Sequence, residues 1–452
     1  MDYDVLICGG GTAGSVAGIA AARQGAKTFI VEQFGFLGGS QTAALVLPLM
    51  QFTTGGMQLV RGLHQEIMDR CDALGGGNES TFFNPELLKY VLEDMVLESG
   101  CEVLYHTFVS NAVLHETGPD ASHSASPTTA SLGAIEVVNK SGKRWIEARQ
   151  FVDCTGDADV AALARAPFES GRPEDGLNQS ASLRFLMGGV DCAALVEFLH
   201  SSGHYATDPK RFDCGFAKGV GENILGTLMA QAEADGVISS EVAGYLQFFS
   251  IPGRPGELAF NCPRVTHING AKAEDLTQVQ LRGRKSIPQV IEFCKRYLPG
   301  FDNAYLSQTA PMPGIRESRR IVGEYTLTAE DFYAARKFDD GIAKSCYGID
   351  VHNPSGGGVK MIHMPEGDWQ EIPYRCLVPQ RVDNLLVAGR CISASFEAQA
   401  AIRIEPTCRA MGEAAGVAAA LCARDGVAPR ALDVGVLLEE LRRLGAEVGG
   451  EA

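Results

Sequence analysis

The chain opens with short apolar runs separated by a glycine-rich turn and an alanine-rich stretch. Residues 5–8 (VLIC) form an apolar run of strand type, and residues 28–31 (TFIV) form a second run that ends at Glu32. Residues 15–24 are rich in alanine with a few larger apolar side chains, and Gly25 follows them, as is typical of a helix C-terminus. The pattern predicts a strand, a glycine turn, a helix and a second strand in direct succession.

The glycine turn reads Gly9-Gly10-Gly11-Thr12-Ala13-Gly14, a G-x-G-x-x-G sequence, and Glu32 lies 18 residues after its last glycine. Gly9 permits the tight turn, Gly11 lets the backbone approach a pyrophosphate, and Gly14 lets the helix lie close to the sheet. The helix N-terminus then faces the phosphates, and the acid accepts hydrogen bonds from a ribose. The segment therefore predicts dinucleotide binding, with contacts from Gly9, Gly11, Thr12, Ala13, Gly14 and Glu32.

A second glycine pair follows the ribose-binding acid and favours FAD over NAD. Gly38 and Gly39 come six and seven residues after Glu32, where the backbone can pass close to the long FAD tail. This segment resembles the glycine-pair region of the glutathione-reductase-type and fumarate-reductase-type flavoproteins. The resemblance implies cofactor contacts at Gln33, Gly38, Gly39, Ser40, Gln41 and Thr42.

Further segments extend the resemblance over nearly the whole chain. Residues 151–159 (FVDCTGDAD), 314–325, 347–353, 373–393 and 403–416 complete the motif set. Together they are similar to the bacterial FAD-dependent oxidoreductase family, which is related to fumarate reductase flavoproteins and to the FAD-binding subunit of heterodisulfide reductase. The similarity runs from about residue 3 to about residue 425. It implies further cofactor contacts at Val109, Cys154, Thr155, Gly156, Asp157, Gly389, Arg390, Arg403, Ile404 and Glu405, with the backbone of the last two stabilising negative charge on reduced flavin.

The sequence departs from the related flavoproteins at two positions. Relatives often carry an acid directly after the glycine at position 389, where this chain has Arg390. An arginine there could contact the pyrophosphate or the ribityl hydroxyls. Some relatives attach the flavin through a histidine after the glycine pair, but residues 40–44 (SQTAA) contain none. We therefore expect FAD that is bound non-covalently.

The expected fold class is α/β, with a Rossmann-like FAD-binding domain of the glutathione-reductase type interrupted by an α+β substrate domain. We assign residues 1–165 and 371–452 to the discontinuous FAD domain and 166–370 to the substrate or cap domain. Within the substrate domain, residues 271–297 predict a long helix interrupted at Pro288, and within the FAD domain residues 117–131 predict an exposed loop. No second G-x-G-x-x-G with a strand before it and a helix after it occurs. A built-in NAD(P)H domain is therefore not expected.

Composition and charge exclude several classes of function. The chain has 39 Lys and Arg against 55 Asp and Glu, a net charge of −16, which disfavours nucleic-acid binding. No apolar run is long enough to span a membrane, and we recognise no signal peptide, so we expect a cytoplasmic protein with no membrane partner. None of the 13 cysteines form a C-x-x-C pair. We expect buried thiols, no metal site and no iron–sulfur relay.

The candidate chemistry lies in a cluster of arginines and in one histidine. Arg316 and Arg319 flank Glu317, and Arg320 follows. Such a cluster can clamp a carboxylate, stabilise an enolate or form a structural ion-pair network. His352 follows an apolar strand-like run, where an acid–base group could face a cofactor. We take Arg316, Arg319 and His352 as candidate catalytic residues.

These observations predict an FAD-dependent oxidoreductase that transfers hydride, by dehydrogenation or C=C reduction, to or from a small organic substrate. The arginine cluster allows that substrate to carry a carboxylate or a carbonyl group. Two alternatives stay open: an oxygen-using flavin oxidase or monooxygenase, and an electron-transfer subunit of a larger complex. We expect a monomer or homo-oligomer whose electron donor or acceptor is external to the chain.

Overall fold

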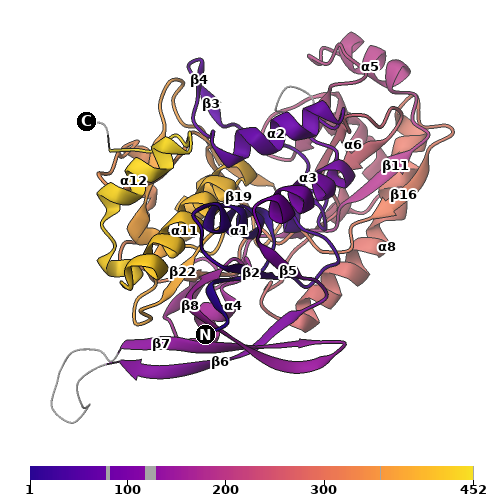
Figure 1. Ribbon diagram of the computed structural model, residues 1–452. Helices are drawn as coiled ribbons and strands as arrows, with labels where there is room; N and C mark the ends of the chain where they lie inside the picture. Colours follow the sequence, from indigo (N-terminus) through magenta and orange to yellow (C-terminus); the bar gives the residue numbers. More distant parts are fainter. Residues whose placement is uncertain (78–81, 118–128, 357, 451–452) are drawn as a thin grey trace.

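The structure is a computed structural model, and it describes residues 1–77, 82–117, 129–356 and 358–450 (Figure 1). Most of the loop predicted over residues 117–131 therefore lies outside the described residues. The main element is a seven-stranded sheet in the order β5-β2-β1-β8-β7-β6, with β22 paired to β8. Its parallel strands are β1 (Tyr3–Cys8), β2 (Thr28–Val31), β5 (Glu102–Leu104), β8 (Gly142–Asp153) and β22 (Leu385–Val387), and its antiparallel strands are β6 (Phe108–Thr117) and β7 (Thr129–Asn139).

The parallel strands end side by side at one edge of this sheet. Cys8 of β1 lies opposite Val31 of β2 and Asp153 of β8, and Val387 of β22 also lies opposite Asp153. Almost every residue of these strands near that edge is buried, as is expected of parallel strands covered on both faces. The predicted α/β class and Rossmann-like sheet are thus confirmed, and the carboxyl edge is where such sheets bind ligands.

Helices cover the faces of the sheet, and two of them cross at very short range. Those that contact the sheet are α1 (Thr12–Arg23), α3 (Pro85–Glu98), α4 (Asp159–Leu163) and α11 (Glu405–Asp425). Helices α2 (Leu63–Ala73) and α12 (Val434–Arg443) pack on α11, and α10 (Phe396–Ile402) packs on β19 (Ile349–His352). A Cβ atom at Gly412 of α11 would lie 2.2 Å from the carbonyl oxygen of Ala13 in α1. Only glycine permits this approach, which brings α11 against α1 (Figure 1).

A second, fully antiparallel sheet comes from the middle of the chain. Its order is β12-β13-β14-β11-β16, and all its residues lie between 185 and 309. The strands are β11 (Phe185–Gly188), β12 (Asp213–Ala217), β13 (Tyr245–Ser250), β14 (Leu258–Phe260) and β16 (Tyr305–Thr309); the accompanying helices are α5 (Cys192–Ser201), α6 (Ile224–Ala234), α7 (Ser240–Ala243) and α8 (Ala273–Tyr297).

Helix α8 runs through Pro288, so the predicted interruption there is wrong. Proline removes one helical hydrogen bond and crowds the preceding turn. Ile287, Val290 and Phe293 around it are nevertheless buried. Packing of this apolar face offsets the local loss, and the helix continues.

Five two-stranded pairs, one short α-helix and three 3-10 turns make up the rest of the described elements. The strands pair as β3 (Thr53–Thr54) with β4 (Met57–Gln58), β9 (Phe168–Ser170) with β17 (Arg319–Ile321), β10 (Ala181–Ser182) with β15 (Arg264–Val265), β18 (Gly341–Ser345) with β21 (Gln370–Pro373), and β19 (Ile349–His352) with β20 (Val359–Ile362). Helix α9 (Ala329–Tyr333) and the 3-10 turns η1 (Gly39–Gln41), η2 (Tyr374–Leu377) and η3 (Pro429–Ala431) complete the described elements.

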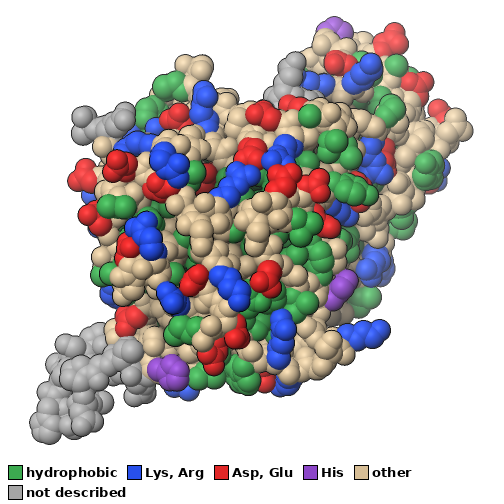
Figure 2. All heavy atoms as spheres, in the orientation of Figure 1, with side chains coloured by type: hydrophobic (Ala, Val, Ile, Leu, Met, Phe, Trp, Pro, Cys, Tyr) green, Lys and Arg blue, Asp and Glu red, His purple; other side chains and the backbone are tan. Residues whose placement is uncertain are grey.

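Acidic and basic side chains are interspersed over the described part of the face drawn in Figure 2. None of the helices in the described ranges is both long enough and apolar enough to cross a membrane.

Candidate functional site

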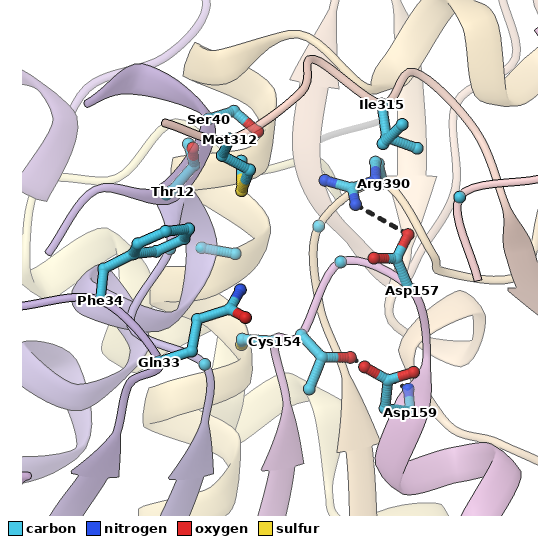
Figure 3. Close-up of a pocket in the computed structure, with 18 of the residues that line it drawn as sticks. Thr12, Gln33, Phe34, Ser40, Cys154, Asp157, Asp159, Met312, Ile315 and Arg390 are labelled. Carbon is cyan, nitrogen blue, oxygen red and sulfur yellow. Dashed lines mark hydrogen bonds and ion pairs between the residues drawn. The ribbon is translucent and has the colours of Figure 1, made fainter. Parts of the chain in front are cut away.

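A cavity of about 530 Å³ lies at the carboxyl edge of the parallel sheet. Its wall includes residues just beyond β1, β8 and β22, among them Gly9, Cys154 and Gly389. In Figure 3, Thr12, Gln33, Phe34 and Ser40 lie on one side of this space and face Asp157, Arg390 and Ile315 on the other. Most of the predicted cofactor and catalytic residues line it: Gly9, Gly11, Thr12, Ala13, Glu32, Gln33, Gly39, Ser40, Val109, Cys154, Thr155, Gly156, Asp157, Gly389, Arg390, Arg403, Glu405 and Arg316.

The two glycine segments meet at the cavity wall. A Cβ atom at Gly39 would lie 2.7 Å from the Cα atom of Gly11, so two backbones touch where side chains would otherwise keep them apart. Helix α1 begins at Thr12, directly beside this contact. Its N-terminal N–H groups and its dipole therefore favour an anionic group such as a pyrophosphate at this wall.

Glu32 is fixed by the backbone at the end of β2. Its Oε2 accepts a hydrogen bond from the Gly10 N–H at 2.7 Å, and its Oε1 accepts one from the Phe34 N–H at 2.8 Å. Burial raises the pKa of this carboxyl group, although these backbone hydrogen bonds oppose the rise. Each carboxylate oxygen retains lone pairs that ribose hydroxyls could use.

Arg390, the residue that replaces an expected acid, forms an ion pair with Asp157 across 2.8 Å from Nη2 to Oδ1 (Figure 3). The turn that carries Asp157 is shaped by Asp153 at the end of β8. The Asp153 carboxylate accepts hydrogen bonds from the Thr155 hydroxyl at 2.7 Å and from the Ala161 N–H at 2.9 Å. The result is a guanidinium and a carboxylate held together in the cavity wall.

Seven predicted residues lie outside the cavity lining that the described chain forms: Gly14, Gly38, Gln41, Thr42, Ile404, Arg319 and His352. Gly14 acts in packing, because a Cβ atom there would lie 1.8 Å from the Gly9 carbonyl oxygen. Gln41 acts from behind the wall, since its Nε2 donates to Glu405 Oε2 at 3.3 Å. Arg319 holds the wall from behind: its Nη1 pairs with the Asp159 carboxylate at 2.7 Å and donates to the Asp157 carbonyl oxygen at 2.9 Å, and both of these partners line the cavity.

His352 belongs to a buried network behind the cavity. Its Nε2 lies 3.1 Å from Asp350 Oδ2, and the same oxygen accepts from the Tyr347 hydroxyl at 3.0 Å and from Arg403 Nη2 at 3.2 Å. Burial and the charge of Arg316 lower the pKa of His352 well below its ordinary value, so we take the ring as neutral. The histidine therefore positions Asp350 and, through it, the cavity-lining Arg403.

Arg184, which the sequence analysis missed, lines the cavity together with Arg316. Arg184 Nε donates to Asn261 Oδ1 at 2.9 Å, and Arg316 Nη1 donates to the Ser180 carbonyl oxygen at 2.6 Å. Burial lowers the pKa of Arg184 to about 10. The sequence carries one signal that could have identified Arg184, because this charged residue stands inside the otherwise apolar run of residues 183–187 (LRFLM).

A third arginine, Arg264, lies near this pair. Burial and the charges of Arg264, Arg184 and Arg403 lower the pKa of Arg316 well below its ordinary value. Arg264 Nε and Nη2, and the hydroxyl oxygens of Ser180 and Ser182, are buried without a hydrogen-bond partner in the described chain. The region thus gathers positive charge and unsatisfied polar atoms, which an anionic ligand would stabilise.

The thiols and possible metal ligands add no further site. All 13 cysteines are free, and all but Cys192 are buried. Within the described ranges, no group of three or more His, Cys, Asp and Glu side chains could hold a metal ion.

Comparison with solved structures returns flavin enzymes as distant structural neighbours. A geranylgeranyl bacteriochlorophyll reductase-like protein from Thermoplasma acidophilum is 12% identical, with 98% of this chain and 82% of that chain covered and a TM-score of 0.43. The flavin-dependent brominase Bmp2 is also 12% identical, covers 98% and 83%, and has a TM-score of 0.45. The p-nitrophenol 4-monooxygenase PnpA from Pseudomonas putida DLL-E4 is 11% identical, covers 97% and 80%, and has a TM-score of 0.43.

Similarity at this level says nothing about the substrate. No curated protein sequence matches the chain. A family profile described as "FAD dependent oxidoreductase", however, matches residues 4–443. The match spans the parallel sheet, the cavity and the second sheet alike. The chain therefore belongs to the FAD-dependent oxidoreductase family, and its cofactor is FAD.

Proposed function

We propose that this enzyme transfers hydride between its FAD and a small organic substrate that carries a carboxylate group. Bound FAD supplies a site that accepts or gives two electrons together with a proton. The observation that carries the proposal is the buried arginine pair, Arg184 and Arg316, in the cavity wall. Relationship to fumarate-reductase-type flavoproteins or to the heterodisulfide reductase subunit, and a cytoplasmic location, are parts of the same proposal.

Each part of FAD can be assigned to residues that line the cavity. We assign the pyrophosphate to the N-terminus of α1 at Gly11 and Thr12, and the adenosine ribose to Glu32. Gln33 and Val109 would lie towards the adenine. Asp157 and Arg390 would hold the ribityl chain, because their ion pair offers both an acceptor and donors to hydroxyl groups.

We assign the substrate to the part of the cavity that Arg184 and Arg316 line. The guanidinium groups of Arg184 and Arg316 donate hydrogen bonds to the neutral oxygens of Asn261 and Ser180. A buried guanidinium without a carboxylate partner is costly, and a planar carboxylate matches its donor geometry. A substrate carboxylate would supply the missing charge and fix the distance of the reacting carbon from the cofactor.

The first test is anaerobic reduction of the purified holoenzyme by a panel of small hydroxy, amino and saturated carboxylic acids, each paired with its neutral amide. We expect flavin bleaching by one of the acids and not by its amide. A panel that neither bleaches oxidised flavin nor re-oxidises reduced flavin would overturn the proposal. Rapid re-oxidation by O₂ with peroxide release would instead favour an oxidase.

A pair of variants links the test to the site. Arg316→Met should raise the Kd or KM for the acid roughly 10- to 100-fold, the range expected for loss of a charged hydrogen bond. Arg320→Met is the matched control: its guanidinium is also buried, it pairs with Glu317, and neither of these two residues lines the cavity. Equal effects of the two substitutions would contradict a specific role for Arg316.

A further inference from the structure

Glu405, the first residue of α11, has one carboxyl oxygen that is buried and has no hydrogen-bond partner in the described chain. The side chain is 6% exposed and lines the cavity. Its other oxygen is held by Gln41, whose Nε2 donates to Oε2 across 3.3 Å. A carboxyl group anchored at one oxygen and unpaired at the other can present that other oxygen to a cavity ligand.

We propose that Glu405 is the proton donor and acceptor for the substrate bound in the cavity. This inference rests on the proposed hydride transfer and adds the group that completes it. When a substrate is oxidised to C=C or C=O, it loses two electrons and two protons. The electrons leave with one proton to FAD, and the second proton goes to the Glu405 carboxylate. In the reducing direction the Glu405 acid returns that proton to the substrate, and the electrons come from reduced FAD.

The surroundings of Glu405 favour its neutral acid form. Burial raises the pKa of this carboxyl group to about 8, although Arg409, Gln41 and Arg184 act to lower it. The position at the N-terminus of α11 also favours the charged form, so burial outweighs every group that faces the carboxyl. Cys408 is the neighbouring titratable side chain on the same helix, and burial raises its pKa to about 12.

Glu405 fits this role better than His352. The histidine does not line the cavity, and its Nε2 is engaged by Asp350 at 3.1 Å. Glu405 lines the cavity beside Arg403 and near Arg184. The acid group and the arginines that would hold the substrate carboxylate therefore meet in one space.

The chain offers a matched control on the same helix. Glu413 lies two turns further along α11, is 2% exposed, and has a pKa that burial raises to about 7. It is not part of the cavity lining, and it accepts a hydrogen bond from the Leu63 N–H at 3.1 Å. Comparing Glu405→Gln with Glu413→Gln separates a buried carboxyl group at the cavity from a buried carboxyl group elsewhere.

The test is infrared titration of the holoenzyme between pH 5 and 10, without substrate. We expect a carboxylic-acid C=O band in the wild type that disappears with a midpoint near pH 8, is absent in Glu405→Gln and persists in Glu413→Gln. Glu405→Asp, which keeps the acid, should retain a band at a shifted position. A wild type without this band, or an unchanged band in Glu405→Gln with its FAD retained, would overturn the proposal.

A second measurement addresses the proton transfer itself. With a substrate from the panel, Glu405→Gln should slow flavin reduction or re-oxidation roughly 100- to 10,000-fold, the usual contribution of a general acid or base. Substrate Kd should change little, since the arginines are intact, and the pH dependence near 8 should vanish. An unchanged rate would refute the role. If no substrate reacts with any variant, the proposed function fails, whereas the infrared result still reports on Glu405.

Discussion

Buried ionisable groups cluster around helix α11, among them Glu405, Arg409 and Glu413. Glu405 and Glu413 are both at most 6% exposed, and the arginines near Glu405 are buried with few carboxylate partners. Ionisable side chains are rarely buried unless they are paired or functional. Because the pKa of such a group differs between the folded and the unfolded state, the free energy of unfolding should depend on pH.

The raised pKa of Glu413 predicts that the protein loses stability as pH rises. Burial raises its pKa from 4.5 to about 7, so between these values the folded state holds a proton that the unfolded state has lost. The free energy of unfolding should then fall as pH rises through this window, by up to roughly 1.4 kcal/mol for each pH unit. Glu413→Gln should remove this contribution and gain stability relative to the wild type from pH 5 to pH 7.

Denaturant unfolding of both proteins at half-unit steps would measure the difference. The glutamine oxygen can still accept from the Leu63 N–H, so loss of that hydrogen bond does not confuse the comparison. A stability difference that stays constant from pH 5 to pH 8 would contradict the raised pKa.

The contact between α1 and α11 joins the first helix of the chain to a helix near its end. It depends on Gly412 and Gly416, where a Cβ atom would lie 2.2 Å from the carbonyl oxygens of Ala13 and Ala17. Backbone atoms cannot move aside as a flexible side chain can. Since Ala13 also lines the cavity, the helix contact and the cofactor site share a residue.

Gly412→Ala should therefore weaken both stability and FAD retention. Forcing one methyl group into this contact should cost about 1–3 kcal/mol of unfolding free energy, and displacement of the first turn of α1 should raise the Kd for FAD. Chemical denaturation and fluorescence titration of the apoprotein with FAD measure the two effects. Gly244→Ala is the control, because its φ is −79° and no atom lies within 4 Å of the added Cβ. A similar effect of both substitutions would argue against the close-contact explanation.

Segments that flank strands of the two sheets meet around the cavity. The parallel sheet contributes the turns after β1, β8 and β22, and the neighbourhood of the antiparallel sheet contributes Arg184 and Arg316. A cofactor that touches groups from so many segments stabilises the folded state by mass action.

We expect FAD to be released when the holoenzyme is precipitated with acid, since Ser40 to Ala44 offer no histidine for attachment. Yellow colour in the supernatant is the expected result, and colour in the pellet would mean covalent attachment. Adding FAD to the apoprotein at about 100 times its Kd should increase the unfolding free energy by about 2.7 kcal/mol. An unchanged melting temperature on adding FAD would contradict binding at this site.

Local sequence determined the elements that depend on short-range chemistry. The strand at residues 28–31, the helix that ends before Gly25, and the turn from Gly9 to Gly14 follow from side-chain periodicity and from positions that only glycine can occupy. The α/β class could be predicted for the same reason, whereas FAD and half of the cavity lining were predicted with the help of the resemblance to a flavoprotein family. The continuity of α8 through Pro288 could not, because burial of its apolar face offsets the local penalty.

Tertiary structure alone decided which charged residues meet. Arg184 and Arg316 are 132 positions apart, yet both line the cavity, and Gln41 and Glu405 are 364 apart, yet they share a hydrogen bond. Neighbours in sequence take different places instead: Arg316 lines the cavity, while Arg319 does not line it and pairs with Asp159 in its wall. Periodicity reports how one segment faces the core, but burial and charge depend on every segment that surrounds a group, so only the folded chain fixes them.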